Sequence, residues 1–172
     1  MAANSITKAS RHTAVWGSQY ARLTGFGGKW IAIPTGYMVA NLSFGTSSTP
    51  DTSYTLTVQA DDLSNIIWQP LSQIIVIKCR IYYGQGSSIN TTHMIALMRY
   101  DIDADGDLSN GVQVGTAATD SNSDDYSQLR STDLAITTDN TITTSQVLVG
   151  MVMPVDISPS AMAAKCIIEY TM

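Results

Sequence analysis

The chain has 172 residues, a formal net charge of −5, 44% hydrophobic residues and only 13% charged residues. This hydrophobic content excludes an intrinsically disordered chain, and no apolar run approaches the roughly 18 residues of a membrane-spanning helix. The length suits one domain with a sizeable core. We therefore expect a single folded domain without a membrane span.

The N-terminal segment is basic, because Lys8, Arg11, Arg22 and Lys29 all precede the first acidic residue, Asp51. Such a segment suits contact with nucleic acid or with an acidic neighbour. Four cations are few for a nucleic-acid site, and a solvated terminus has the same composition. The opening stretch "MAANSITKASRHTAVW" also lacks the apolar region of a secretory signal, so we expect an intracellular origin or a mature form.

From Lys29 onward, runs of alternating apolar and polar residues recur between clusters of Gly, Pro, Ser, Asn and Asp. β-branched residues dominate these runs, as they do in strands, and no segment has a convincing helical stripe. We predict strands at Lys29–Ile33, Tyr37–Phe44, Tyr54–Gln59, Ile66–Gln69, Gln73–Tyr83, Thr92–Tyr100, Val112–Ala117, Leu134–Thr138, Thr141–Val152 and Ala164–Thr171.

Short strands at this spacing indicate an all-β fold, either a sandwich or a barrel. We predict an antiparallel β-sandwich of 8–10 short strands, jelly-roll-like, that spans residues 24–172. Residues 1–23 are predicted to form an extended N-terminal arm in front of it.

Two of the predicted strands have apolar residues on both faces. In "IIVIKCRIYYG", alternation puts Ile75, Ile77, Cys79 and Ile81 on one face and Ile74, Val76, Lys78, Arg80 and Tyr82 on the other. The stretch "VLVGMVMPV", residues 147–155, is apolar on both faces as well. A second apolar face indicates either a covering loop or a contact with another subunit, and the pattern alone leaves both open. If it is a contact, we expect Ile74, Val76 and the Met151–Met153 region to meet other copies.

The two cysteines, Cys79 and Cys166, both lie on the apolar side of a predicted strand. Buried free thiols are common in protein cores, so we expect core thiols, with a disulfide as the alternative. No C-x-x-C spacing indicates a metal or redox site.

A cluster of acids in "RYDIDADGDLSNG", residues 99–111, has the beginning of a calcium loop. Calcium loops of the EF-hand type take oxygen ligands from positions 1, 3, 5 and 7, with glycine at position 6. The candidate metal ligands are therefore Asp101, Asp103, Asp105 and Asp107, with Gly106 at the glycine position.

The match covers only half of such a loop, because Val112 stands where a bidentate glutamate should close it. The closing ligand would come from Asp120, Asp124 or Asp125, from a backbone carbonyl, or from a neighbouring subunit. The alternative is a solvated loop between two strands, for which Asp and Gly are also preferred residues.

Catalytic motifs are missing from the chain. It has neither a G-x-S-x-G nor an H-E-x-x-H pattern, and Glu169 is its single glutamate, so acid–base pairs of the glycosidase type lose most of their candidates. Pairs of aspartates and a Ser–His–Asp site, whose members need not be adjacent, stay open but have no supporting motif. We therefore expect that the protein is not an enzyme. Trp16, Trp30 and Trp68 could form a platform for a sugar, although aromatic residues in strands more often belong to a core or an interface.

An N-terminal arm, eight or more strands with loops rich in Ser, Thr and Asn, and a last strand at "AKCIIEYTM" form a recognisable architecture. It resembles the single jelly-roll structural proteins of virions, namely small viral capsid proteins and the head-decoration or knob proteins of tailed phages. The resemblance implies a non-enzymatic subunit in a virion, which binds its own copies and other virion proteins through its arm and sheet faces. Any calcium would then act as a structural staple. The alternatives are a carbohydrate-binding or adhesin-like sandwich and a subunit of an extracellular filament.

Overall fold

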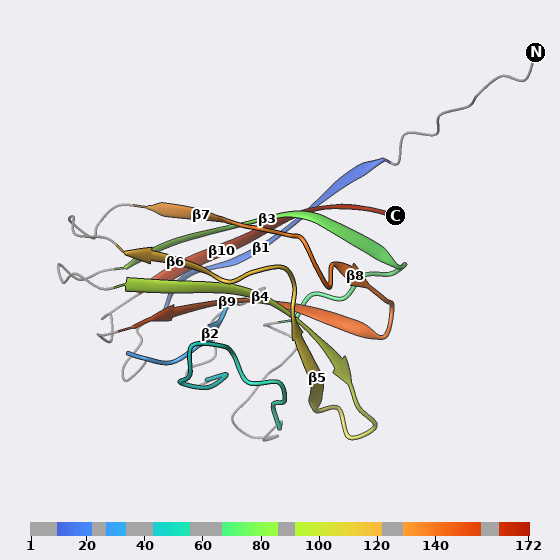
Figure 1. The fold of residues 1–172 in the computed structure, drawn as a ribbon, viewed down its shortest axis with the longest axis horizontal. Coiled ribbons are helices and arrows are strands. Elements are labelled where there is room, and N and C mark those ends of the chain that lie inside the picture. The colour runs from blue at the N-terminus through green and yellow to red at the C-terminus, as the bar shows by residue number, and fades with distance from the viewer. Residues whose placement is uncertain are drawn as a thin grey trace, which may run out of the picture.

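The computed structural model describes residues 10–21, 27–33, 43–55, 67–85, 92–121, 129–155 and 162–172. None of these residues is helical, and no helix in the described part could span a membrane. They form ten strands in two layers (Figure 1): β1 Arg11–Ala21, β2 Ile31–Ala32, β3 Ile74–Gln85, β4 Thr92–Ile102, β5 Leu108–Gln113, β6 Ala118–Ser121, β7 Arg130–Leu134, β8 Thr141–Ile142, β9 Gln146–Pro154 and β10 Met162–Thr171.

The strands pair in two antiparallel sheets. The first sheet has the order β1-β10-β3-β7, with β8 also paired to β3, and the second has the order β2-β9-β4-β5, with β6 also paired to β4. Strands β5 and β6 therefore act as one interrupted strand on β4, and β7 and β8 as one on β3. Counted in this way, the sheets have the orders 1-8-3-6 and 2-7-4-5. This is the strand order of a jelly roll, so the predicted all-β sandwich is confirmed.

The interruptions have local causes. Gly115, between β5 and β6, has a φ of 72°, and a Cβ at that position would lie 2.3 Å from the carbonyl oxygen of Ala135. The predicted strand Val112–Ala117 therefore falls on a break. A turn at Thr143 splits the predicted strand Thr141–Val152, because the backbone N–H of Gln146 donates to the Thr143 carbonyl at 3.1 Å. The predictions at residues 37–44 and 54–59 lie mostly outside the described residues.

Strand β1 differs from the prediction. Residues 1–23 were expected to form an arm, but Arg11–Ala21 pairs with β10 as an outer strand of the first sheet. The alternation of apolar residues did not reveal this strand, because two of its inward-facing residues, His12 and Ala14, contribute little hydrophobicity beside Trp16. Residues 1–9, 22 and 23 of the predicted arm lie outside the described residues, so for them the arm stays a prediction.

The inner core lies between the two sheets. Cys79 and Ile81 of β3 point into it as predicted, but the orientation of the first part of the strand was predicted wrongly. Ile74 and Val76 are buried in this core, whereas Ile75 is 42% exposed. The register explains the difference, because Glu169 of β10 pairs with Lys78 while the next residue, Tyr170, pairs with Val76. One residue of β3 is thus unmatched, a β-bulge that exchanges the two faces of the strand.

The central strands of the second sheet, β9 and β4, are largely buried on both faces by the chain itself. The outer face of this sheet packs against a second cluster that includes Trp30, Phe44 and Tyr54. Residues 43–55, the covering segment, are held there by Trp30, whose Nε1 donates to the Ser47 carbonyl at 3.0 Å. Tyr100 of β4 also holds them, because its hydroxyl donates to the Asp51 carbonyl at 2.7 Å and its ring lies 5.9 Å from that of Phe44. The apolar faces of β9 are thereby explained by a covering segment. The prediction that Ile74, Val76 and the Met151–Met153 region meet other copies is wrong, since these side chains are buried within the same chain.

Candidate functional site

The predicted calcium loop is the connection between β4 and β5. One oxygen of Asp103 accepts hydrogen bonds from the backbone N–H groups of Asp105 and Asp107, both at 3.0 Å. Asp101 faces other partners, since its carboxylate accepts from the side-chain amides of Asn110 at 3.1 Å and Gln146 at 3.0 Å. A carboxylate that caps the backbone two and four residues on is typical of a closed Asp-Gly turn.

The carboxylates of this loop are not gathered around one point. Among the described residues, no three His, Cys, Asp or Glu side chains come together as a metal-holding group. Of the possible closing ligands, Asp120 is engaged by Arg130, and Asp124 and Asp125 lie outside the described residues. Calcium binding by the loop therefore stays a prediction, while the contacts present are those of a self-capped loop.

A cluster of polar side chains, the polar clamp, joins the two sheets at one end of the sandwich. Tyr83 on β3 and Arg130 on β7 come from the first sheet, and His93 on β4 and Asp120 on β6 come from the second. Arg130 donates to the two oxygens of Asp120 at 2.6 and 2.8 Å, and the hydroxyl of Tyr83 donates to the same carboxylate. The ring of His93 lies against the Tyr83 ring, with centroids 4.8 Å apart.

The electrostatics of the polar clamp follow from burial and from the ion pair. Burial lowers the pKa of His93 to about 4, an effect that Asp120 opposes and Arg130 reinforces. Burial and the hydrogen bond to Asp120 raise the pKa of Tyr83 to about 12. The hydrogen bonds from Arg130 lower the pKa of Asp120 despite its partial burial. At neutral pH the clamp thus holds one carboxylate, one guanidinium and two neutral rings.

This cluster has little capacity for acid–base chemistry, because the carboxylate of Asp120 is already occupied by a bidentate arginine and a phenol. Its geometry fits a tie between sheets. From the sequence alone, Asp120 was expected only as a possible closing ligand for calcium, and nothing pointed to Arg130. Pairing of β6 with β4 and of β7 with β3 brings these residues together, and no local spacing of residues encodes those pairings.

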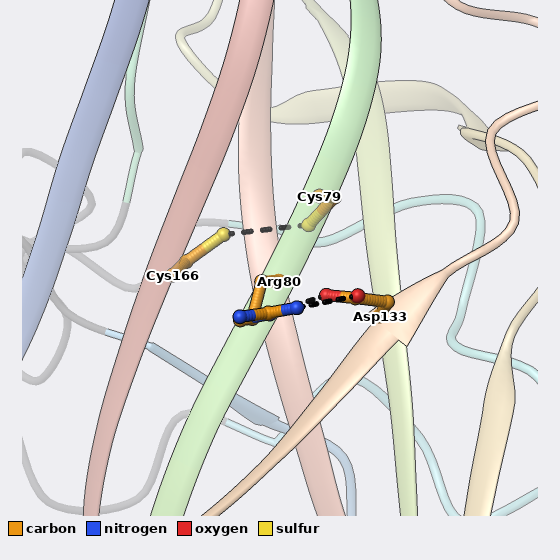
Figure 2. A network of polar contacts seen from close by, with 4 residues as sticks. All are labelled: Cys79, Arg80, Asp133 and Cys166. Carbon is orange, nitrogen blue, oxygen red and sulfur yellow. Dashed lines mark hydrogen bonds and ion pairs between the residues drawn. The ribbon is translucent and has the colours of Figure 1, made fainter.

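The cysteines lie side by side on β3 and β10, and Figure 2 shows them next to the ion pair of Arg80 and Asp133. Both thiols are free and buried, with their sulfur atoms 3.8 Å apart, so the prediction of core thiols is confirmed. Burial raises the pKa of the Cys166 thiol. Gly150 of β9 leaves room for this sulfur, because a Cβ there would lie 3.1 Å from it.

The outer face of the first sheet, the open face, has exposed side chains, whereas the outer face of the second sheet is covered by residues 43–55. Cross-strand neighbours form one row from Val15 on β1 through Ile167 on β10 and Arg80 on β3 to Asp133 on β7. Val15 is 51% exposed. Two adjoining hollows run along the face, of about 240 and 110 Å³, and both are lined by Tyr82 and Ile167.

Charged side chains flank the apolar residues of the open face. Arg80 forms a bidentate pair with Asp133, at 2.5 and 2.7 Å, and lowers the pKa of that carboxyl group. Lys78 and Lys165 make no ion pair with the described residues. A face on which exposed apolar side chains are interspersed with charged ones has the composition of a protein interface.

The basic N-terminal residues do not converge on a nucleic-acid site in the described part of the chain. Arg11 lies 4.0 Å from Glu169 on the open face, whereas Lys8 and Arg22 fall outside the described residues. The predicted sugar platform also does not form there. Trp16 and Trp30 are buried, and Trp68 stacks on Trp16 at 5.9 Å within the fold.

No protein-family model matches the chain, and no curated protein matches it either. Among solved structures, a match is found to a chain in the structure of infectious bursal disease virus, Gx strain. The TM-score is 0.41 at 9% sequence identity, and the match covers 96% of this chain and 32% of that chain. This chain therefore spans about a third of the length of that one.

Proposed function

We propose that this protein is a non-enzymatic structural subunit that assembles with further copies of itself in a virion, as a capsid or capsid-decorating protein. The observation that carries the proposal is the difference between the outer faces of the two sheets. The covering segment buries the outer face of the second sheet with Trp30 and Phe44. The open face instead leaves Val15 and Ile75 half exposed among its charges.

Exposed apolar side chains on one sheet of a domain whose other sheet is covered favour a binding partner at the exposed face. The covering segment lies on the second sheet, and no described segment covers the first sheet in the same way. The fold therefore does not by itself require that an outer sheet face stays exposed. The two hollows lined by Tyr82 and Ile167 give this face a concave surface that a partner can fill, and Lys78 and Lys165 beside them give it positive charge. A contact that excludes water from these apolar side chains would be stabilised by roughly 25 cal/mol for each Å² of apolar area that it buries.

The virion setting is the more specific part of the proposal. Jelly rolls occur in both viral capsids and lectins, so the fold alone leaves both classes open. We favour assembly over sugar binding because Trp16 and Trp30, the aromatic residues expected to bind a sugar, are buried. A stiff two-sheet block with one open face is suited to packing side by side with its copies.

Mass photometry and negative-stain microscopy of the purified protein test the proposal. We expect multimers, and we expect Ile167→Lys combined with Ile75→Lys to shift the population toward monomers. Thr137→Lys, at an exposed position outside the strands, is the matched control and should leave the distribution unchanged. A wild-type chain that stays monomeric at micromolar concentration would contradict the proposal.

A further inference from the structure

Strand β1 differs from the other strands at the sheet edges in its length. It has 11 residues, while β7 and β8 at the other edge of the first sheet have 5 and 2, and β2, β5 and β6 at the edges of the second sheet have 2, 6 and 4. Within the described residues, β1 pairs with β10 alone, so its second edge has no strand beside it there. A long edge strand presents a row of unpaired backbone groups that another chain can join.

The first part of β1, from Arg11 to Ser18, lacks the features that usually protect such an edge. Proteins protect edges with short strands, with lysine or proline, with inward-pointing charges or with β-bulges, and the register shift of β1 lies beyond this part, between Ser18 and Ala21. Here Arg11 at the first position is the only Lys, Arg, Asp or Glu, and the strand has no proline. The register with β10 is also unbroken from Arg11 to Ser18, so this part of the edge is regular.

The side chains of β1 fit a second copy of the same strand. Val15 is 51% exposed, and it lies opposite Ile167 in the sheet. In an antiparallel pair centred on Val15, this residue faces the partner subunit's Val15, so that Ile167 and Val15 of both copies form one apolar row. Thr13 then faces the partner subunit's Gly17. The two Arg11 side chains lie at opposite ends of the shared ladder, so like charges do not meet.

We propose that β1 pairs antiparallel with β1 of a second copy across a twofold axis at Val15, which joins the first sheets of two subunits into one continuous sheet. The proposal rests on the proposed function, because it names one contact of the assembly. The contact is isologous, so it closes after two copies and satisfies both exposed edges at once.

A cysteine cross-link tests this register. Directly opposite residues in an antiparallel pair have Cα atoms about 4.5–5.5 Å apart, within the range that a disulfide spans. Val15→Cys should therefore form a covalent dimer when oxidised glutathione is added, visible on a non-reducing gel. The native Cys79 and Cys166 are buried and should not react in the folded protein.

Thr13→Cys is the matched control, since it lies on the same strand and face but faces the partner subunit's Gly17 in this register. We expect most Val15→Cys chains to cross-link and less than about a tenth of Thr13→Cys chains. Equal cross-linking of the two variants, or none, would overturn the proposal. Multimers in mass photometry without a Val15→Cys cross-link would leave the proposed function standing, whereas monomers throughout would remove both.

Amide hydrogen exchange on the unmodified protein gives a second measurement that needs no variant. The outward backbone N–H groups of β1 should exchange at least tenfold more slowly in the assembled protein than in a dilute monomeric sample. Exchange in β1 that is as fast after assembly as before would contradict the pairing, whichever way the variants behave.

Discussion

Arg130 donates two hydrogen bonds to Asp120, at 2.6 and 2.8 Å, and the pair connects β7 of the first sheet to β6 of the second. The fork geometry satisfies both carboxylate oxygens at the edge of the sandwich. Tyr83 adds a hydroxyl donor from β3. The polar clamp is thus one place where polar side chains, rather than the apolar core, connect the two sheets.

Asp120→Asn should destabilise the protein by about 1–3 kcal/mol, because a partly buried guanidinium loses its charged partner. The midpoint of urea unfolding measures this change. Asp133→Asn is the matched control, since it breaks a bidentate arginine pair that is solvent-exposed on the open face. Its effect should be much smaller, because exposed ion pairs are screened by water. Equal losses of unfolding free energy in the two variants would show that the partly buried position of the polar clamp adds nothing to stability.

Stability should fall on acidification through the range in which His93 would titrate. The folded protein lowers the pKa of His93 from 6.5 to about 4, so below pH 6.5 the unfolded chain binds a proton more readily than the folded one. The contribution is complete above pH 6.5 and is lost as the pH falls to about 4, by up to about 3 kcal/mol. Urea unfolding at several pH values measures the slope. His93→Gln should flatten it, and an unchanged slope would contradict this origin.

Asp103→Ala should loosen the loop between β4 and β5 whether or not calcium is present. Its carboxylate caps the backbone N–H groups of Asp105 and Asp107, and the loss of these bonds should cost about 1 kcal/mol. Asp105→Ala removes an exposed carboxylate from the same loop and should change stability little. Thermal unfolding in the presence of calcium and of a chelator distinguishes a calcium-binding loop from a loop closed only by its own hydrogen bonds. If calcium binds there, it should stabilise the wild type and neither variant.

Phe44→Ala should be strongly destabilising, by about 3–5 kcal/mol, since a fully buried ring on the second sheet is removed. The stacking on Tyr54 would be lost as well. Val15→Ala, on the open face, should stay within roughly 0.5 kcal/mol for the isolated subunit. Denaturant unfolding of both variants measures the contrast. A small effect of Phe44→Ala would mean that the covering segment contributes little to the fold.

The sequence predicted the strand class of this fold well, because period-two alternation and β-branched residues are local signals. It failed on β3, where one unmatched residue exchanges the faces and buries Ile74 and Val76. A bulge depends on the pairing partner, so alternation along one strand cannot locate it. The polar clamp was missed for a similar reason, since Asp120 and Arg130 belong to different sheets.

The sequence by itself determined that the chain is all-β and that Cys79 and Cys166 lie on the apolar side of their strands, since alternation and burial preference are properties of each strand. Only the tertiary structure decided which apolar faces remain uncovered. The stretch "VLVGMVMPV" is apolar on both sides whether a loop or a partner covers it, and the position of Phe44 on the second sheet settles that choice. The open face and the long edge of β1 follow from strand order, which depends on contacts between residues far apart in the chain.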